Sequence, residues 1–358
     1  MTLRPLAVGL ATALLAVGAL VLLLALTGHD PAAALGALWA GAAGSRYALL
    51  SATLVRAVPL ILAGLAVAVA FRAGILNVGA EGQLLAGGGA ATAVGLALGA
   101  APAIVALPAA LLAGVAAGAA WAGIAAVLRR RFGVLEVIST IMLNFVALHA
   151  AGWLVRGPLQ EPQRIYPQSP SLGAAAQLPV IVPGSRLHLG FALAVAAGVA
   201  LWAFLRFTAA GFRLRATGLN PFAAASAGRI DVAAVTTAAF LASGALAGLA
   251  GAVEVTGVTY ALYENLSPGY GYTAIAVALL ARLHPLGVVA SGILFGALEA
   301  GAGAMQRDAG VPAVVVTVVE ALLILLVLAA DRLGERLRER APAPAAAVPA
   351  VERAEAAA

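Results

Sequence analysis

The chain of 358 residues is 63% hydrophobic and only 10% charged, with a mean hydropathy of +1.03. A soluble domain has about 25% charged residues, so this composition excludes an ordinary soluble protein. The absence of cysteine excludes disulfides and cysteine-bound metals. The net charge of +6 lies largely in predicted loops and in the C-terminal tail, which indicates membrane topology rather than nucleic-acid binding.

Long apolar runs predict an all-α polytopic protein that is embedded in membrane lipid. The runs are continuous and lack the alternation of an outer-membrane barrel. The first run is longer than the ~7–15-residue apolar core of a signal peptide, so we expect it to remain as a span. The runs predict ten spans, at 6–27, 47–70, 79–98, 103–128, 134–155, 189–207, 232–252, 271–282, 286–305 and 312–330.

The arginine distribution orients these spans, because cytoplasmic segments carry an excess of basic residues. With the N-terminus inside, cytoplasmic segments hold fifteen arginines and outer segments hold five, with Arg56 inside a span. Ten spans therefore place both termini in the cytoplasm. The predicted organisation is a transmembrane domain at 1–330 and a charged, Ala/Pro-rich tail at 331–358, which we expect to be disordered.

Two interruptions of the apolar pattern lie at matching places in the two halves of the chain. The first is "FRAGILNVGAEGQ" at 71–83, and the second is "ENLSPGYGY" at 264–272. The span at 271–282 is also too short to cross, since 12 residues rise only about 18 Å. Paired interruptions mark the pathway in transporters with inverted repeats. We therefore expect spans 2–5 and 7–10 to form such a repeat.

The first interruption supplies three candidate pathway residues, Asn77, Glu81 and Gln83. Retained charge inside a bilayer is a functional candidate, because uncompensated charge there is costly. The alternative is a cytoplasmic loop in which Glu81 pairs with Arg72. Asn77 is equally suited to capping the third span.

Four further candidates lie on or beside later spans. Glu136 and Asn144 are eight residues apart and near one helix face, although Glu136 also suits the start of a helix and Asn144 also suits a helix–helix hydrogen bond. Tyr270 and Tyr272 flank Gly271 and could stack on a planar ring. The alternative for both tyrosines is the aromatic belt at the membrane interface.

The segment between spans 6 and 7 predicts a short exposed helix on the cytoplasmic side. Asn220 is a suitable N-cap, Pro221 suits the first turn, and Gly228 suits the end. Asp231 can then cap span 7. A small-residue helix of this kind fits a groove on another protein.

Four stretches of the chain resemble the permease subunits of bacterial ABC importers for simple, ribose-like sugars and nucleosides. They are 71–83, "EVISTIMLNFVALH" at 136–149, "RATGLNPFAAASAGR" at 215–229, and 269–298; the first two look most like the nucleoside branch. The resemblance implies an inner-membrane subunit, with a second homologous permease and an extracytoplasmic binding lipoprotein as partners. It also implies an ATPase-coupling segment with the residues Arg213, Arg215, Asn220, Pro221, Phe222, Ala224 and Arg229.

ATP hydrolysis is expected on a separate ATPase subunit, because the chain has no phosphate-binding loop and no lysine to form one. No cofactor is expected in this chain. A simple-sugar permease is the alternative within the family. An ion-coupled transporter is disfavoured by the scarcity of intramembrane carboxylates beyond Glu299 and Glu320. An enzyme is disfavoured because no catalytic set occurs and the four histidines lack metal-binding spacing.

Overall fold

The computed structural model describes residues 15, 17–312, 314–315, 317–318 and 321. This part of the chain folds into helices and forms no strand. A first helical stretch covers Val17–Leu26. The helices that follow are α2 (Pro31–Ala42), α3 (Leu54–Arg72), α4 (Ala80–Ala97), α5 (Ala103–Phe132), α6 (Glu136–Arg156), α7 (Gly190–Phe207), α8 (Ala209–Leu219), α9 (Pro221–Gly228), α10 (Val232–Glu254), α11 (Tyr270–Leu280) and α12 (Pro285–Asp308). π-Helical segments at Ala48–Thr53 and Val255–Thr259 extend α3 and α10.

Six helical segments in the described residues are long and apolar enough to cross a membrane. They are Ala48–Arg72, Ala103–Phe132, Glu136–Arg156, Gly190–Phe207, Val232–Thr259 and Pro285–Asp308. The expected spans at 79–98 and 271–282 correspond to less apolar or shorter helices. Of the expected span at 6–27, the helix Val17–Leu26 is described, whereas 6–14 and 16 lie outside the described residues. Most of 312–330 and the whole tail at 331–358 lie outside the described residues. The 12-residue helix α2 was not predicted, because it is shorter than the ~18–20 apolar residues that mark a membrane span.

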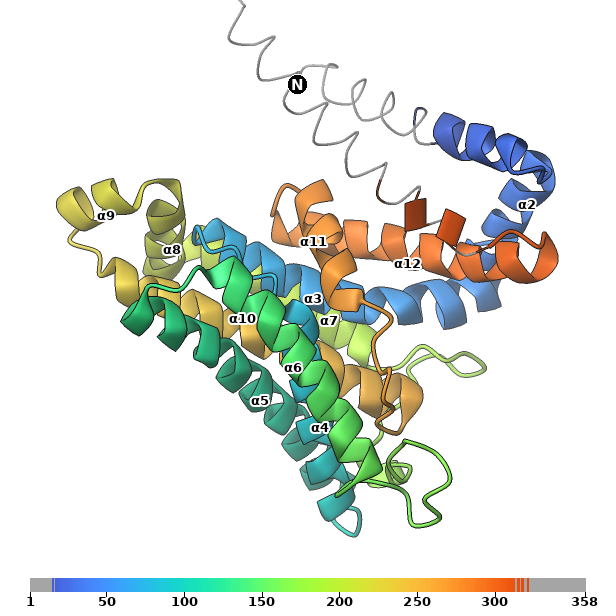
Figure 1. Cartoon of the computed structure of the whole chain (residues 1–358), viewed down its shortest axis with the longest axis horizontal. Coiled ribbons are helices and arrows are strands. Elements are labelled where there is room, and N and C mark those ends of the chain that lie inside the picture. Colours follow the sequence, from blue (N-terminus) through green and yellow to red (C-terminus); the bar gives the residue numbers. More distant parts are fainter. Residues whose placement is uncertain (1–14, 16, 313, 316, 319–320, 322–358) are drawn as a thin grey trace, which may run out of the picture.

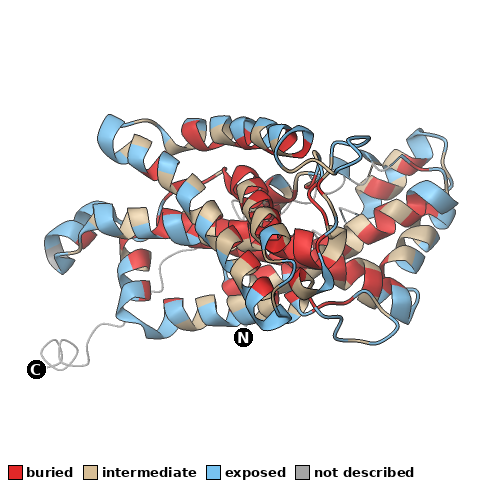
Figure 2. Cartoon of the chain, turned by 90° about the horizontal axis from the view of Figure 1, so that it is seen from below, coloured by how far each residue is buried: buried red, intermediate tan, exposed pale blue. Residues whose placement is uncertain are grey.

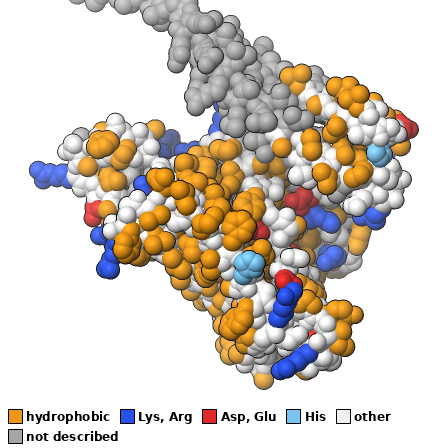
Figure 3. All heavy atoms as spheres, viewed as in Figure 1, with side chains coloured by type: hydrophobic (Ala, Val, Ile, Leu, Met, Phe, Trp, Pro, Cys, Tyr) orange, Lys and Arg blue, Asp and Glu red, His pale blue; other side chains and the backbone are white. Residues whose placement is uncertain are grey.

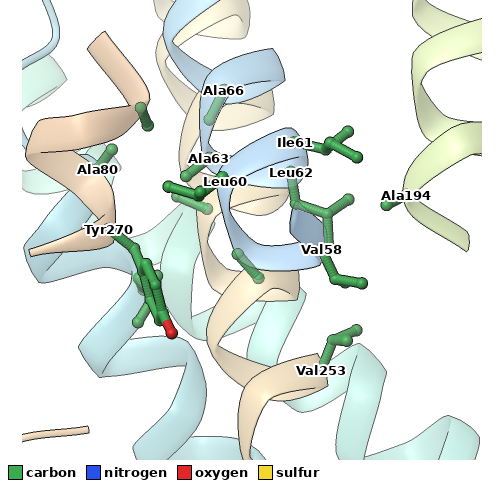
Figure 4. Packing of buried hydrophobic residues seen from close by; sticks show 14 of the residues in the cluster. Val58, Leu60, Ile61, Leu62, Ala63, Ala66, Ala80, Ala194, Val253 and Tyr270 are labelled. Carbon is green, nitrogen blue, oxygen red and sulfur yellow. The ribbon is translucent and has the colours of Figure 1, made fainter. Parts of the chain in front are cut away.

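α3 forms the centre of the molecule and is buried around most of its circumference (Figures 2 and 4). It packs against α7, α10, α11 and α12. Figure 4 shows Ala80 and Tyr270 on one side of α3 and Ala194 on the other. A helix that is apolar all round must be enclosed by protein or lipid, and here the neighbouring helices enclose it.

Glycines bring α4, α5 and α10 unusually close together. A Cβ atom at Gly118 would overlap the Gly244 carbonyl, and one at Gly251 would overlap the Leu84 carbonyl. Small residues at such crossings let helix backbones approach and pack in a membrane. This contact fixes the position of α4, which carries two of the predicted site residues, Glu81 and Gln83.

Two irregular segments separate the helices that matter for the site. We call residues 73–79, between α3 and α4, the first break, and residues 260–269, between the π-helical end of α10 and α11, the second break. The connection 157–189 is irregular apart from one turn of 3-10 helix at Ala174–Ala176. It covers part of the second break through hydrogen bonds from the Ser169 and Leu172 backbone N–H groups to the carbonyls of Leu262 and Tyr260, at 2.9 and 2.7 Å.

The two ends of the molecule differ in what they present. Figure 1 shows α8, α9 and the C-terminal end of α5 at one end, and the connection 157–189 far from them. The first end carries the arginines of α5 and α8.

Candidate functional site

Asn77 and Gln83 form a buried amide pair where the first break enters α4. Each side-chain NH2 group donates to the other side chain's oxygen at 3.1 Å. Asn77 also donates to Ser243 Oγ of α10 at 2.9 Å and accepts the Gly79 N–H at 2.9 Å. Asn77 is 0% and Gln83 1% exposed. Gly79, rather than Asn77, is the N-cap of α4. The buried amide pair therefore fixes the backbone of the first break and attaches it to α4 and α10.

Asn144 on α6 satisfies backbone groups of the same segment. Its Oδ1 accepts the Gly82 N–H at 2.8 Å, and its Nδ2 donates to the Val78 carbonyl at 3.0 Å and to the Tyr272 hydroxyl at 3.2 Å. The first N–H groups of a helix have no partner inside the helix, so Asn144 supplies one for α4. Asn144 therefore makes the helix–helix hydrogen bond that was the alternative to ligand binding. It bonds to α11 as well as to α4 and the first break.

Glu81 lies where the N-termini of α4 and α11 meet. Its Oε2 accepts the Gly271 N–H at 2.7 Å, and the Ser267 hydroxyl is a second hydrogen-bond partner. A Cβ atom at residue 271 would overlap the Glu81 backbone nitrogen, so only glycine permits this approach. Both helix N-termini carry partial positive charge, and the carboxylate between them compensates it.

The alternative that paired Glu81 with Arg72 is wrong. Arg72 Nε instead donates to the Leu283 carbonyl, at 2.8 Å, just beyond the end of α11. Glu81 is buried, at 7% exposure, and points to α11 rather than to an aqueous loop. Arg72 and Glu81 therefore tie the first break to both ends of α11.

The two candidate tyrosines have different surroundings. Tyr270 is 8% exposed and belongs to the main hydrophobic core (Figure 4), whereas Tyr272 is 45% exposed. Residues two apart on a helix point to different sides. The structure therefore does not present the two rings together, and only Tyr272 can meet a solute.

Glu136 is separated from the other site candidates. Its Oε2 lies 3.5 Å from Arg129 Nε, at the junction of α5 and α6. It occupies the first turn of α6, where an acidic side chain favours the helix dipole. The structure thus brings together Asn77, Glu81, Gln83, Asn144 and Tyr272, and it leaves Glu136 and Tyr270 outside that group.

The segment around α8 and α9 folds as its sequence predicts. Asn220 Oδ1 accepts the Ala223 N–H at 3.0 Å, Pro221 occupies the first turn, and α9 ends at Gly228. Asp231 Oδ1 caps α10 through the Ala234 N–H at 2.9 Å. Arg213, Asn220, Pro221, Phe222 and Arg229 are exposed, Arg215 is half-buried, and Ala224 is buried.

α8 touches the first break directly. A Cβ atom at Gly218 would overlap the Arg72 carbonyl, and one at Gly74 would lie 3.4 Å from the Gly218 Cα. Gly74 has a φ of 76°, which favours glycine. The exposed α8–α9 segment and the Glu81 junction are thus connected through the residues that end α3.

The chain matches one protein family over most of its length. Residues 49–328 match the model of the branched-chain amino acid transport system permease component. The chain belongs to this permease family. It is a transport subunit and a multi-pass protein of the plasma membrane, as predicted.

Several named relatives of the permease are ABC transporter subunits. It is 42% identical over 318 residues to the guanosine ABC transporter permease of Bacillus subtilis, covering 87% of this chain and 89% of the relative. It is 40% identical to a glucose ABC transporter permease of Haloferax volcanii, covering 84% and 81%. It is 32% identical to a nucleoside ABC transporter permease of Lactococcus lactis, covering 75% and 76%. No solved structure gives a significant match.

Sequence reasoning missed several groups that complete the permease's site. Ser243 links the amide pair to α3, because its hydroxyl donates to the Ala66 carbonyl at 2.7 Å. Ser267 accepts the Gly269 and Tyr270 N–H groups at 3.2 and 3.0 Å and so starts α11. The Ser-Pro-Gly triplet of the second break is a turn signal that could have indicated Ser267. Ser243 had no local signal, since its partners are far away in sequence.

Proposed function

We propose that this permease forms the membrane path of an ATP-driven importer for nucleosides. The observation that carries the proposal is its 42% identity, over 87% of its length, to a guanosine permease. The paired breaks support the proposal, because interrupted helices with facing N-termini mark the pathway in several transporters. The reaction is transport, and the ATP would be hydrolysed on a separate ATPase subunit.

The proposed assembly contains a second homologous permease and an extracytoplasmic binding lipoprotein. We place both termini in the cytoplasm, with ten spans and an inverted repeat of spans 2–5 and 7–10. The arginine-rich end with α8 and α9 supports this orientation, since cytoplasmic loops are enriched in basic residues (Figure 3). In that orientation, the connection 157–189 faces outward and toward the lipoprotein.

The α8–α9 segment is the proposed contact with the ATPase. Phe222 is 84% exposed at the start of α9, beside Asn220 and Pro221. An exposed aromatic side chain on a capped, rigid helix is a suitable anchor for a pocket on a partner. The contact of Gly218 with Arg72 gives this segment a direct connection to the first break.

A glucose importer is the second candidate, because a glucose permease is 40% identical over a similar share of the chain. Uptake by cells that express the complete importer separates the two functions. Labelled guanosine and uridine should accumulate only when the permease and ATPase are both present, and labelled glucose should not. If glucose accumulated and neither nucleoside did, the importer would be a glucose importer and the proposed nucleoside function would be wrong.

The ATPase contact is tested by Phe222→Asp, with Phe132→Asp as its matched control. Phe132 is 71% exposed and ends α5, at the same end of the molecule. We expect Phe222→Asp to lose co-purification with the ATPase while Phe132→Asp retains it. Equal co-purification of the two variants would remove α9 from the interface.

A further inference from the structure

A cavity of about 350 Å³ lies between the C-terminal half of α6 and the second break. Its volume falls in the ~300–1,000 Å³ range of small-molecule sites. Its lining residues are Leu148, His149, Gly152, Trp153, Arg156, Glu264 and Asn265.

The lining differs from the rest of the exposed face of α6. Toward the N-terminus of α6 the exposed side chains are apolar and include Ile138, Met142 and Phe145. Around the cavity they are His149, Trp153 and Arg156, together with one aliphatic side chain, Leu148. In Figure 3, histidine, acidic and arginine side chains gather below the larger apolar area. Ionisable groups on a spanning helix point to a wet or protein-lined place rather than to lipid.

Glu264 is held in a fixed position at the cavity. Its Oε2 lies 2.7 Å from Arg156 Nη2. Its Oε1 faces α6, where a Cβ atom at Gly152 would lie 3.3 Å away, so glycine leaves room for the carboxylate. One oxygen is thus taken by the guanidinium, and the other can accept hydrogen bonds from hydroxyl groups. The exposed amide of Asn265 adds a donor and an acceptor.

The cavity lies on the same face of α6 as the junction of α4 and α11. Asn144, Leu148 and Gly152 follow each other at four-residue spacing on one face of α6. From Gly152 to Asn144 this face descends about 12 Å. There the Asn144 amide meets the Tyr272 hydroxyl and the backbone of α4.

We propose that this cavity is the outer vestibule that receives the nucleoside. The Trp153 ring stacks on the base, while Glu264 and Asn265 bind the ribose hydroxyls. The chemistry matches, because a nucleoside combines a planar ring with vicinal hydroxyl groups. This inference rests on the proposed function.

The test is direct binding to the permease–ATPase complex in lipid nanodiscs, without the binding lipoprotein. Equilibrium dialysis with labelled guanosine and uridine measures Kd for Trp153→Ala and for Trp39→Ala. Both tryptophans are 67% exposed, and Trp39 lies on α2, away from the cavity. We expect Trp153→Ala to raise Kd roughly tenfold, in line with the loss of one base-stacking contact, and Trp39→Ala to leave Kd unchanged.

Glu264→Gln tests the ribose contact with a second ligand. The wild-type complex should bind uridine more tightly than 2′,3′-dideoxyuridine, and Glu264→Gln should remove most of this preference. Equal effects of the two tryptophan variants would show that Trp153 is only an interfacial anchor and would overturn the vestibule. Absence of nucleoside binding by the wild-type complex would also overturn it. Cellular uptake of nucleosides in that case would leave the proposed function intact.

Discussion

The two breaks lie at matching places in the two halves of the chain but differ in what they expose. In the first break, Asn77 and the neighbouring Gln83 are buried and bond to each other, to α10 and to the backbone. At the second break, Asn265 and Tyr272 are exposed, and Glu264 is half-exposed beside a cavity. Polar residues in an apolar chain therefore serve two purposes here. One set fastens helices together, and the other is exposed beside the cavity.

The largest effect is expected where the two breaks meet, at Gly271. Gly271→Ala places a methyl group against the Glu81 backbone, so α4 and α11 must separate. Overpacking of this kind costs about 3 kcal/mol. Thermal unfolding of the purified permease measures it, with Gly36→Ala as the control, since that site has open space and lies in a helix. Similar melting temperatures for both variants would disprove the close junction.

The next test asks whether the first break is structural. Asn77→Ala leaves the Gln83 amide and the Gly79 N–H without a partner, at a cost of about 2–3 kcal/mol. The same change at the exposed Asn265 should leave stability nearly unchanged. Unfolding and uptake kinetics are measured together. If Asn77→Ala kept full stability but raised the KM for uptake, the first break would be the one that meets cargo.

Acid should weaken the packing of the connection 157–189 against the π-helical end of α10. His188 is buried against Gly190 and Gly257, and burial, together with the nearby Arg186 guanidinium, lowers the pKa of His188 to about 4. An unfolded histidine has a pKa near 6.5, so the unfolded chain binds the proton first as pH falls. Stability should therefore drop by about 2 kcal/mol between pH 7.5 and pH 5.

His188→Gln should flatten this pH dependence, while the other histidines remain in place. Melting temperatures across the pH series provide the measurement. An unchanged slope in His188→Gln would assign the acid sensitivity to other groups.

A smaller effect is expected at the link between α8 and the first break. Gly218→Ala pushes α8 away from the Arg72 carbonyl. We expect ATPase assembly to persist while nucleoside uptake falls roughly 2- to 30-fold, the range for a lost coupling contact. Gly123→Ala, which meets only the flexible Leu241 side chain, is the control. Normal uptake by Gly218→Ala would show that coupling takes another route.

The smallest change in stability should come from Tyr272→Phe. Asn144 Nδ2 keeps its bond to Val78, so only one interhelical hydrogen bond is lost, worth about 0.6 kcal/mol. If Tyr272 lines the path, the variant should still raise the KM for uptake. An unchanged KM would show that the Tyr272 hydroxyl does not contact the substrate. The proposed contact with substrate would then be confined to the cavity beside α6.

Local sequence signals predicted some features well and others not at all. Both breaks, the Asn220 and Asp231 caps and the short α11 follow from turn residues, capping side chains and run length. The Glu81–Gly271 contact joins residues 190 positions apart, and no local pattern carries that information. The different fates of Tyr270 and Tyr272 could have been predicted, because two residues on one helix two positions apart face different ways. The contact between Gly218 of α8 and the Arg72 carbonyl could not have been predicted from the sequence.

The single carboxylate of Glu81 has a mechanical consequence. It is shared between two helix starts in the buried interior of the protein, where an uncompensated charge is costly. Drawing α4 away from α11 would strand both the charge and the two positive helix ends. We therefore expect α4 and α11 to move together as one unit in any movement of the permease that displaces either helix.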